Sequence, residues 1–364
     1  ATEQATNSGF LSNVQVTTDP SVQQMPSVAV NPLDPNHVVL TYLDYSLVDT
    51  GYAGIGVSVS RDGGEHWQTS SVPIPKPFAE GAASPVVKFD DRGQLFVTYS
   101  AATFLGDKPA ITNPDFFNAD LGISERSFGT ESHNGVFITS SLDGGVNWSA
   151  PAAVSANEYD GENAVNFELS PDLAIDTFPT LPTGEPNPNY GNLYVVWTRL
   201  YAAGQFPGEP ESTGGGDLMI AVSRDAGQNW EAQFADFDGT NRPVLQLPIN
   251  FGTEVPSGLS VADQPHIDIG PLGDLYVSGF WGNNFAVLHS TNSAQSFTAA
   301  DLNSGHGLVF GTDFTATVNA DGLPNNRFRT HSVRAIAADP TQSGRAFAVE
   351  PLPVFDTFGN QVDP

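Results

Sequence analysis

The sequence predicts an all-β protein built from repeated four-stranded antiparallel sheets, and three observations lead to this fold class. The 364 residues include 36 Gly and 28 Pro and are 39% hydrophobic, a turn-rich composition that can bury several apolar layers. An eight-residue motif that begins with Ser-x-Asp recurs along the chain. A second motif, a Pro followed by alternating apolar residues, recurs at similar intervals, which indicates internal repeats.

The first motif, here called a repeat turn, reads Ser-x-Asp-x-Gly-x-x-Trp. Its copies are Ser60–Trp67, Ser141–Trp148, Ser223–Trp230 and a degenerate fourth, Ser290–Phe297. The steps between the acidic positions (62 to 143, 143 to 225, 225 to 292) are 81, 82 and 67 residues, each long enough for one four-stranded sheet. Asp can accept N–H groups of the turn that it opens, and Gly supplies a positive φ. We therefore predict hairpin turns whose four aromatic rings pack back on their own sheets and are largely buried.

The second motif marks the first strand of each predicted sheet. Its copies are Pro26–Val30, Pro85–Phe89, Pro171–Ile175, Pro265–Ile269 and, with Arg in place of Pro, Arg334–Ala338. A turn and an alternating second strand follow each copy, over His37–Tyr42, Gln94–Tyr99, Asn192–Trp197, Asp274–Ser278 and Arg345–Val349. Five sheets therefore begin, whereas four end with a repeat turn.

The repeat turns resemble the Asp-box (bacterial neuraminidase) repeats of the sialidase-like β-propellers, over roughly residues 20 to 350. The resemblance implies an all-β propeller of four-stranded antiparallel blades that start near residues 26, 85, 171, 265 and 334. Sialidase relatives commonly have six blades, so a sixth is expected if the chain is part of a longer protein. In that superfamily the box lies on the face away from the active site, so the resemblance predicts the architecture of the chain rather than its activity.

Ring closure is the open point of this architecture. Fifteen residues follow Val349, too few for two ordinary strands and their turn. Residues 1–20 form an N-terminal tail in which Asn13–Thr18 alternates as a short strand, and the propeller spans residues 21–364. We expect that strand to pair into the last blade, because an open sheet edge would promote aggregation. Otherwise, a segment missing from this chain or a neighbouring subunit completes the ring.

Charge and composition exclude several functions. Lys and Arg total 13 against 41 Asp and Glu, a net charge of −28 that repels nucleic acid and anionic membranes. Cysteine is absent, which excludes disulfides and thiolate metal sites. The sequence contains no run of 18 apolar residues, so no membrane span is predicted. An N-terminus that reads Ala-Thr-Glu-Gln is typical of a mature end after leader removal, so we expect a secreted protein.

The resemblance implies a set of catalytic and binding residues that sialidase activity requires. It implies an arginine triad that grips a carboxylate, a Tyr nucleophile assisted by Glu, an acid/base Asp and a Phe/Tyr-Arg-Ile-Pro motif near the start. That motif is absent, and nothing in the local sequence singles out a triad such as Arg199, Arg242 and Arg329. True sialidase activity is therefore not expected. A broader glycosidase needs only two carboxylates roughly 5 to 10 Å apart.

The candidate site residues lie where strand ends and long loops should gather at the central mouth. Glu168 and Asp263, directly before two first strands, are the candidate catalytic carboxylates. The candidate substrate-binding residues are Asp44, Arg199, His266, Trp281, Arg329, His331 and Arg334. The alternative for each carboxylate is a solvated loop group in an acidic protein, and for each His a hydrogen-bonded structural group.

Calcium is the metal that the sequence favours, and no organic cofactor is expected. The loop Asp236–Asn241 places oxygen ligands Asp236, Asp238 and Asn241 around a Gly turn, although it lacks the closing Glu of an EF-hand. The loop Glu158–Asn163 is similarly rich in oxygen atoms. The alternative for both loops is an ordinary Asp-Gly turn.

Two functions from different classes remain open. The first is a secreted sialidase-like β-propeller that engages an extracellular glycan on its loop-rich face, either as a glycoside hydrolase or without catalysis. The second is a non-catalytic structural or protein-binding module at the cell surface or in an extracellular assembly. Neither function involves nucleic acid or membrane insertion.

Overall fold

The computed structural model describes residues 14–48, 52–103, 130–202, 216–232, 244–245, 262–281, 284–299, 316–319, 327–330, 335–349, 354–355 and 361–362. All the regular secondary structure in these residues is β, which confirms the predicted class. No helix among them is long and apolar enough to cross a membrane.

Four sheets each contain four antiparallel strands in chain order, as the repeats predicted, and one of them has a fifth, short strand. The first contains β1 (Gln23–Asn31), β2 (Asp34–Asp44), β3 (Gly54–Ser60) and β4 (Gln68–Ser71). The second contains β5 (Gly81–Phe89), β6 (Leu95–Ala102), β7 (Asn134–Ser141) and β8 (Ala152–Asn157). The third contains β9 (Phe167–Ile175), β10 (Leu193–Leu200), β11 (Gly216–Ser223) and β12 (Glu231–Ala232), with β13 (Val244–Leu245) also paired to β11. The fourth contains β14 (Ala262–Ile269), β15 (Leu275–Trp281), β16 (Asn284–Ser290) and β17 (Thr298–Ala299).

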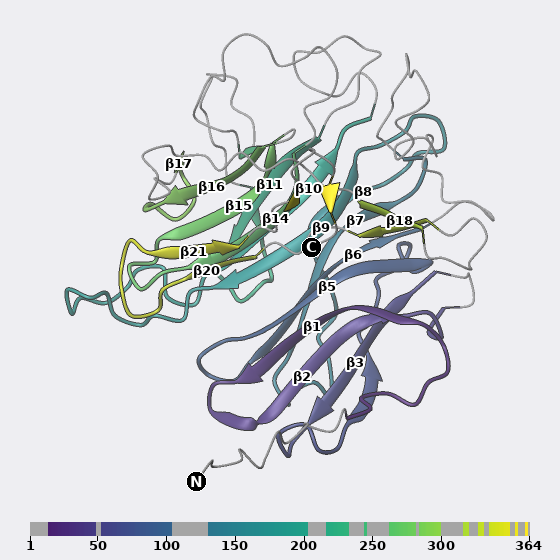
Figure 1. Ribbon diagram of the computed structural model, residues 1–364, viewed down its shortest axis with the longest axis horizontal. Helices are drawn as coiled ribbons and strands as arrows, with labels where there is room; N and C mark the ends of the chain where they lie inside the picture. The colour runs from purple at the N-terminus through teal and green to yellow at the C-terminus, as the bar shows by residue number, and fades with distance from the viewer. Residues whose placement is uncertain are drawn as a thin grey trace.

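Consecutive sheets pack face to face, and their first strands lie next to one another (Figure 1). Strand β1 contacts β5, β5 contacts β9, and β9 contacts β14. An apolar cluster fills each space between two sheets. Tyr99 and Val57 lie between the first and second sheets, Trp197 and Phe96 between the second and third, and Tyr194 and Ile267 between the third and fourth. The core is therefore a series of layers between sheets.

The first strands begin before the Pro that was expected to open them, and this is a correction to the sequence analysis. The residues before three of these prolines, Met25, Ser84 and Ser170, have φ between 51° and 53°. The pairing of each first strand shifts register at this point, which identifies a β-bulge. Glu168 and Asp263, expected just outside the first strands, therefore lie inside β9 and β14.

The C-terminal part contains three further two-stranded pairs. They are β18 (Ala316–Asn319) with β19 (Arg327–Thr330), β20 (Ala335–Ala338) with β21 (Ala346–Val349), and β22 (Val354–Phe355) with β23 (Gln361–Val362). The pair β20–β21 is the expected fifth start, and β20 contacts β14. The residues after Val349 contain two strands of only two residues each, shorter than ordinary strands. Residues 14–18 of the expected strand Asn13–Thr18 are not in a strand, which corrects that expectation.

The repeat turns are held by their own Ser and Asp side chains. In the second turn, Ser141 Oγ donates to Asp143 Oδ1 at 2.8 Å and accepts the Gly145 N–H at 2.9 Å. Asp143 also accepts the backbone N–H and the side-chain amide of Asn147 at 2.8 and 2.6 Å. These hydrogen bonds, the backbone one foremost, lower the pKa of Asp143 to about 2. The first, third and fourth turns repeat the pattern, with Asn292 in place of Asp in the fourth.

The four aromatic rings of the repeat turns are less uniformly buried than expected. Phe297 is buried, whereas Trp67, Trp148 and Trp230 are only half-buried. Trp67 and Trp230 each donate their indole N–H to a glycine carbonyl of their own turn, at 3.0 and 3.1 Å. The Trp rings therefore cover their turns rather than fill the core.

Two side chains of the first sheet fasten it to the second repeat turn. His37, which is 1% exposed, hydrogen-bonds through Nε2 to the Gly144 carbonyl at 3.1 Å and through Nδ1 to Asn31 at 3.1 Å. Arg61 donates to the carbonyls of Asp143 and Gly144 at 3.0 and 3.3 Å. Because a carbonyl only accepts, His37 Nε2 carries the proton and Nδ1 accepts from the Asn31 amide.

Gly144 is the position at which this fastening tolerates no side chain. Its φ is +73°, and an added Cβ would lie 2.4 Å from Arg61 Nη2 and 2.5 Å from His37 Cε1. We expect Gly144→Ala to lower the free energy of unfolding by about 3 kcal/mol, from backbone strain plus the clash. The matched control is Gly184→Ala, with φ +87° and no atom within 4 Å, which carries only the backbone cost of about 1 to 2 kcal/mol. Equal losses in urea unfolding would contradict the packing argument.

His37 should contribute to the pH dependence of stability. Burial, aided by the positive charge of Arg61, lowers the pKa of His37 below its ordinary 6.5. Below about pH 6.5 the unfolded chain therefore binds a proton at His37 more readily than the folded chain does. The stability that neutral His37 contributes is fully present above about pH 6.5 and is lost as the pH falls below that value. Relative to the wild type, His37→Gln should show a smaller loss of unfolding free energy between pH 7 and 5. Parallel stability curves for the two proteins would refute this role.

Candidate functional site

A polar cluster lies where β10 ends, and the alternation of that strand places its members. Trp197, Arg199 and Tyr201 follow one another at every second position, so they share one face of β10 and its extension. Across the sheet Arg199 pairs directly with Glu168 of β9, beyond the bulge at Ser170. The bulge shifts the alternation of β9, which sets which of its residues stand opposite β10.

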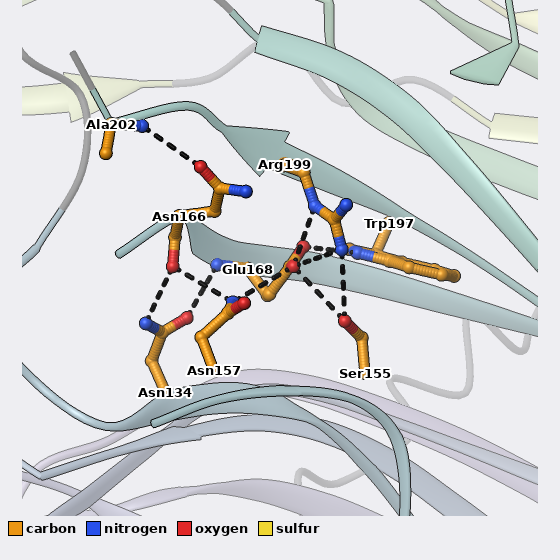
Figure 2. A network of polar contacts seen from close by, with 8 residues as sticks. All are labelled: Asn134, Ser155, Asn157, Asn166, Glu168, Trp197, Arg199 and Ala202. Carbon is orange, nitrogen blue, oxygen red and sulfur yellow. Dashed lines mark hydrogen bonds and ion pairs between the residues drawn. The ribbon is translucent and has the colours of Figure 1, made fainter. Parts of the chain in front are cut away.

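Glu168 is the centre of the cluster (Figure 2). Its side chain is fully buried. Arg199 donates to Glu168 Oε1 from both Nε at 2.8 Å and Nη2 at 2.6 Å. Trp197 donates its indole N–H to Oε2 at 2.5 Å. A carboxylate without solvent contact requires such donors, because burial of an unpaired charge is costly.

The second sheet supplies the remaining donors. Ser155 Oγ and Asn157 Nδ2 of β8 donate to Glu168 Oε1 at 3.2 and 3.1 Å, and Asn134 Oδ1 of β7 accepts the Glu168 N–H at 2.8 Å. Figure 2 shows these groups converging on Glu168 from both sheets. At this end of the sheets, polar contacts therefore connect the second and third sheets. Elsewhere an apolar layer connects them. With five donors on its two oxygens, the Glu168 carboxylate is arranged to hold Arg199 and Trp197 in place.

Tyr201 extends the cluster toward β11. Its side chain is 6% exposed and hydrogen-bonds with both Arg199 and Asp217. Burial, and next the negative charge of Asp217, raise the pKa of Tyr201 well above its ordinary value. The phenol is therefore protonated at neutral pH. Glu168, Arg199, Tyr201 and Asp217 thus form one cluster across the ends of β9, β10 and β11.

A small cavity of about 170 Å³ adjoins this cluster. Its wall includes Glu168 and Phe167 from the third sheet and small side chains such as Ala82 from the second, with Tyr45 just after β2 and Tyr52 just before β3. Burial and the charge of Glu80 raise the pKa of Tyr52. The cavity therefore joins aromatic rings to a rigid polar group, the usual composition of a small-molecule site.

The structure brings together two of the predicted site residues, Glu168 and Arg199. Asp44 is buried at the end of β2, where its carboxylate accepts the N–H and hydroxyl of Ser46 at 2.9 and 2.7 Å. His266 of β14 contacts Asp172 at 3.3 Å. The backbones of Asp263, Trp281 and Arg329 lie in β14, β15 and β19. The two predicted residues that lie outside the described residues are His331 and Arg334. The acid/base role of Glu168 and Asp263 stays a prediction.

The proposed calcium ligands Asp236, Asp238 and Asn241 also lie outside the described residues, so this metal stays a prediction. In the second oxygen-rich loop, Asp160 Oδ1 accepts the N–H groups of Glu162 and Asn163 at 2.9 and 3.1 Å, the pattern of an ordinary Asp turn. Within the described part of the chain, the side chains of Asp62, Glu65 and His66 are close enough to share a metal ion. The Asp62 carboxylate there already accepts the Ser60 hydroxyl and the His66 backbone N–H.

Trp197, Ser155, Asn157 and Tyr201 belong to the site, although the sequence analysis did not assign them to it. The signal was present in Trp197-Thr198-Arg199-Leu200-Tyr201, whose alternating positions are polar or aromatic at the end of an otherwise apolar strand. Ser155 and Asn157 carry no such signal, because only the packing of β8 against the third sheet brings them to Glu168.

No family model and no curated protein matches this sequence. Solved structures similar to it include a protein of unknown function from Dyadobacter fermentans, at 16% identity and a TM-score of 0.41, over 76% of this chain and 67% of that one. A leech intramolecular trans-sialidase complexed with 2,7-anhydro-Neu5Ac is 13% identical, with a TM-score of 0.45, over 78% of this chain and 52% of that one. Trypanosoma rangeli sialidase in complex with sialic acid is 14% identical, with a TM-score of 0.46, over 91% and 44%. The chain thus spans about half the length of these two sialidases.

The ion pair at the centre of the cluster gives a stability prediction. Glu168→Leu leaves Arg199 buried without its partner and should cost about 3 to 5 kcal/mol of unfolding free energy. Replacing both residues, with Glu168→Leu and Arg199→Met, should recover much of this loss. The matched control is Glu231→Leu, which breaks the exposed pair with Arg224 and should cost at most about 1 kcal/mol. Similar costs for the two single variants in urea unfolding would contradict the described burial.

Proposed function

We propose that this chain is a secreted, sialidase-like β-propeller that engages extracellular carbohydrate at the cavity beside Glu168. The observation that carries the proposal is a cavity with aromatic side chains in its wall, next to the polar cluster around Glu168, at one end of three neighbouring sheets. A sugar ring has apolar C–H faces and a rim of hydroxyls that both donate and accept hydrogen bonds. Tyr45, Tyr52 and Phe167 offer the rings, and Glu168, held in place by Arg199, is the charged side chain of the cavity wall.

The size of the cavity restricts the ligand. About 170 Å³ is below the roughly 300 to 1,000 Å³ of sites for drug-sized molecules, so it suits one sugar unit, such as the end of a glycan. Hydrolysis would require a second carboxylate across the bond. Asp263, in the neighbouring sheet, is the candidate from the sequence.

A glycan array, with hydrolysis assays on the same glycans, tests the proposal. We expect the wild type to bind a subset of glycans and Tyr52→Ala to weaken that binding about tenfold or more, because a stacking ring is lost. The matched control is Tyr190→Ala. Tyr190 precedes β10, at the opposite end of that strand from Arg199, and its hydroxyl donates a hydrogen bond to Asp91. Absence of binding to any glycan, or equal binding by wild type and Tyr52→Ala, would overturn the proposal.

A second candidate, a structural or protein-binding module, is favoured by the exposed face of the first strand. Val28 of β1 is 62% exposed, whereas the residues two positions after Pro in the next three first strands, Val87, Leu173 and Ile267, are 0 to 3% exposed. Those three pack on the preceding sheet. A further blade of the same kind, from this protein or from a neighbouring subunit, would cover Val28 and close the ring. A chain that binds no glycan fits this candidate.

A further inference from the structure

The crevices between neighbouring repeat turns lie at the other end of the sheets, and they differ from one another. Between the first and second turns, His37 and Arg61 fill the space and donate to the carbonyls of Asp143 and Gly144. Between the second and third turns, here called the turn crevice, there is a cavity of about 580 Å³. This volume lies in the range of ligand-binding sites.

The internal repeat explains why the turn crevice is open. Gln94 occupies the position of His37, because each lies four residues before the Thr of its second strand, Thr98 and Thr41. Leu142 occupies the position of Arg61 after the Ser of its repeat turn, and it is 84% exposed. The cationic clamp of the first crevice is therefore replaced by a neutral amide and an apolar side chain.

The acceptors that the clamp would use are still in place. The carbonyls of Asp225 and Ala226 correspond to those of Asp143 and Gly144, and Ala226 keeps the positive φ of Gly144, at 57° and 73°. Among the described residues, no hydrogen bond reaches either carbonyl, whereas their counterparts in the second turn accept from Arg61. Ala226 lines the cavity and Asp225 directly precedes it, and carbonyls that lack a hydrogen bond attract a donor.

Trp148 is a second and independent irregularity in the turn crevice. Its indole nitrogen is buried and has no hydrogen-bond partner, whereas Trp67 and Trp230 donate to their own turns. The ring also lines the cavity, together with Phe96 and Ile138. An aromatic ring beside apolar side chains suits the stem and the planar cationic head of an arginine.

The electrostatics of the crevice agree with a cation. Asp143 lines the cavity, and hydrogen bonds lower the pKa of its carboxyl to about 2, so it is ionised at neutral pH. The amides of Gln94, Asn147 and Gln228 add no positive charge to the wall, and the whole chain carries a net charge of −28.

We propose that the turn crevice binds an arginine side chain of a partner protein, which donates to the carbonyls of Asp225 and Ala226 as Arg61 does within this chain. A guanidinium is the one protein group that combines several planar donors, a permanent charge and the capacity to stack on an aromatic ring. This site is on the face away from Glu168 and does not depend on the carbohydrate proposal.

Titration of the full chain with the peptide acetyl-Gly-Arg-Gly-amide tests this proposal. The same peptide with citrulline, which is neutral and similar in shape, is the ligand control. The signal is the indole N–H resonance of Trp148, one of five Trp, assigned from its loss in Trp148→Phe. We expect the arginine peptide to shift this resonance with a Kd of about 1 mM, and the citrulline peptide to bind about tenfold more weakly or less.

Two variants of the same turn sharpen the result. Leu142→Arg supplies the clamp from within, so it should abolish binding of the peptide and raise the unfolding temperature. Val146→Arg adds the same charge at an exposed position that does not line the cavity and should leave binding unchanged within about twofold. Equal binding of both peptides, or equal binding by wild type and Leu142→Arg, would overturn the proposal. So would a shift produced only by a neutral glycan.

Discussion

The structure depends on the mutual burial of sheet faces. A single four-stranded sheet has two faces and too little thickness to form a core, so each sheet here uses its neighbours. Val87 of β5 and Leu173 of β9 are fully buried because the preceding sheet covers them. This dependence makes the first strands the organising elements, since each contacts the first strand of the next sheet. It also explains why an uncovered first strand, as in β1, is an exception.

Against this apolar pattern, the two ends of the sheets have different chemistry. At one end the bulge at Ser170 lets β9 carry Glu168 opposite Arg199, and polar groups replace the apolar layer. At the other end, the second repeat turn is joined to the preceding sheet through the backbone carbonyls of Asp143 and Gly144. Because the apolar layers fix the sheets, the chemistry at the two ends can differ from one sheet to the next, and this is where function is expected in such architectures.

Most of the fold could be predicted from the sequence, because alternation and repeat spacing are local signals. The residues before Pro26, Pro85 and Pro171 were missed as strand because a bulge interrupts the alternation there. At the site, Glu168 and Arg199 were each found, but not their pairing, which depends on the register of β9 and β10 across that bulge. Ser155 and Asn157 could not be predicted, since packing between two sheets, rather than any sequence pattern, brings them to Glu168.

The fourth repeat turn shows how a motif can change while its shape is kept. Ser293 and Ala294 have φ values of 57° and 67°, in the left-handed region that costs a residue with a Cβ about 1 to 2 kcal/mol. Ala294 and Phe297 are nevertheless buried, and Asn292 still accepts the Ser290 hydroxyl at 2.9 Å. Tertiary packing thus holds the turn after its glycines have been lost. The sequence of a repeat can therefore diverge until sequence comparison no longer detects it, while its turn keeps the same hydrogen bonds. The number of repeats in a divergent relative is better counted from these hydrogen bonds than from the sequence motif.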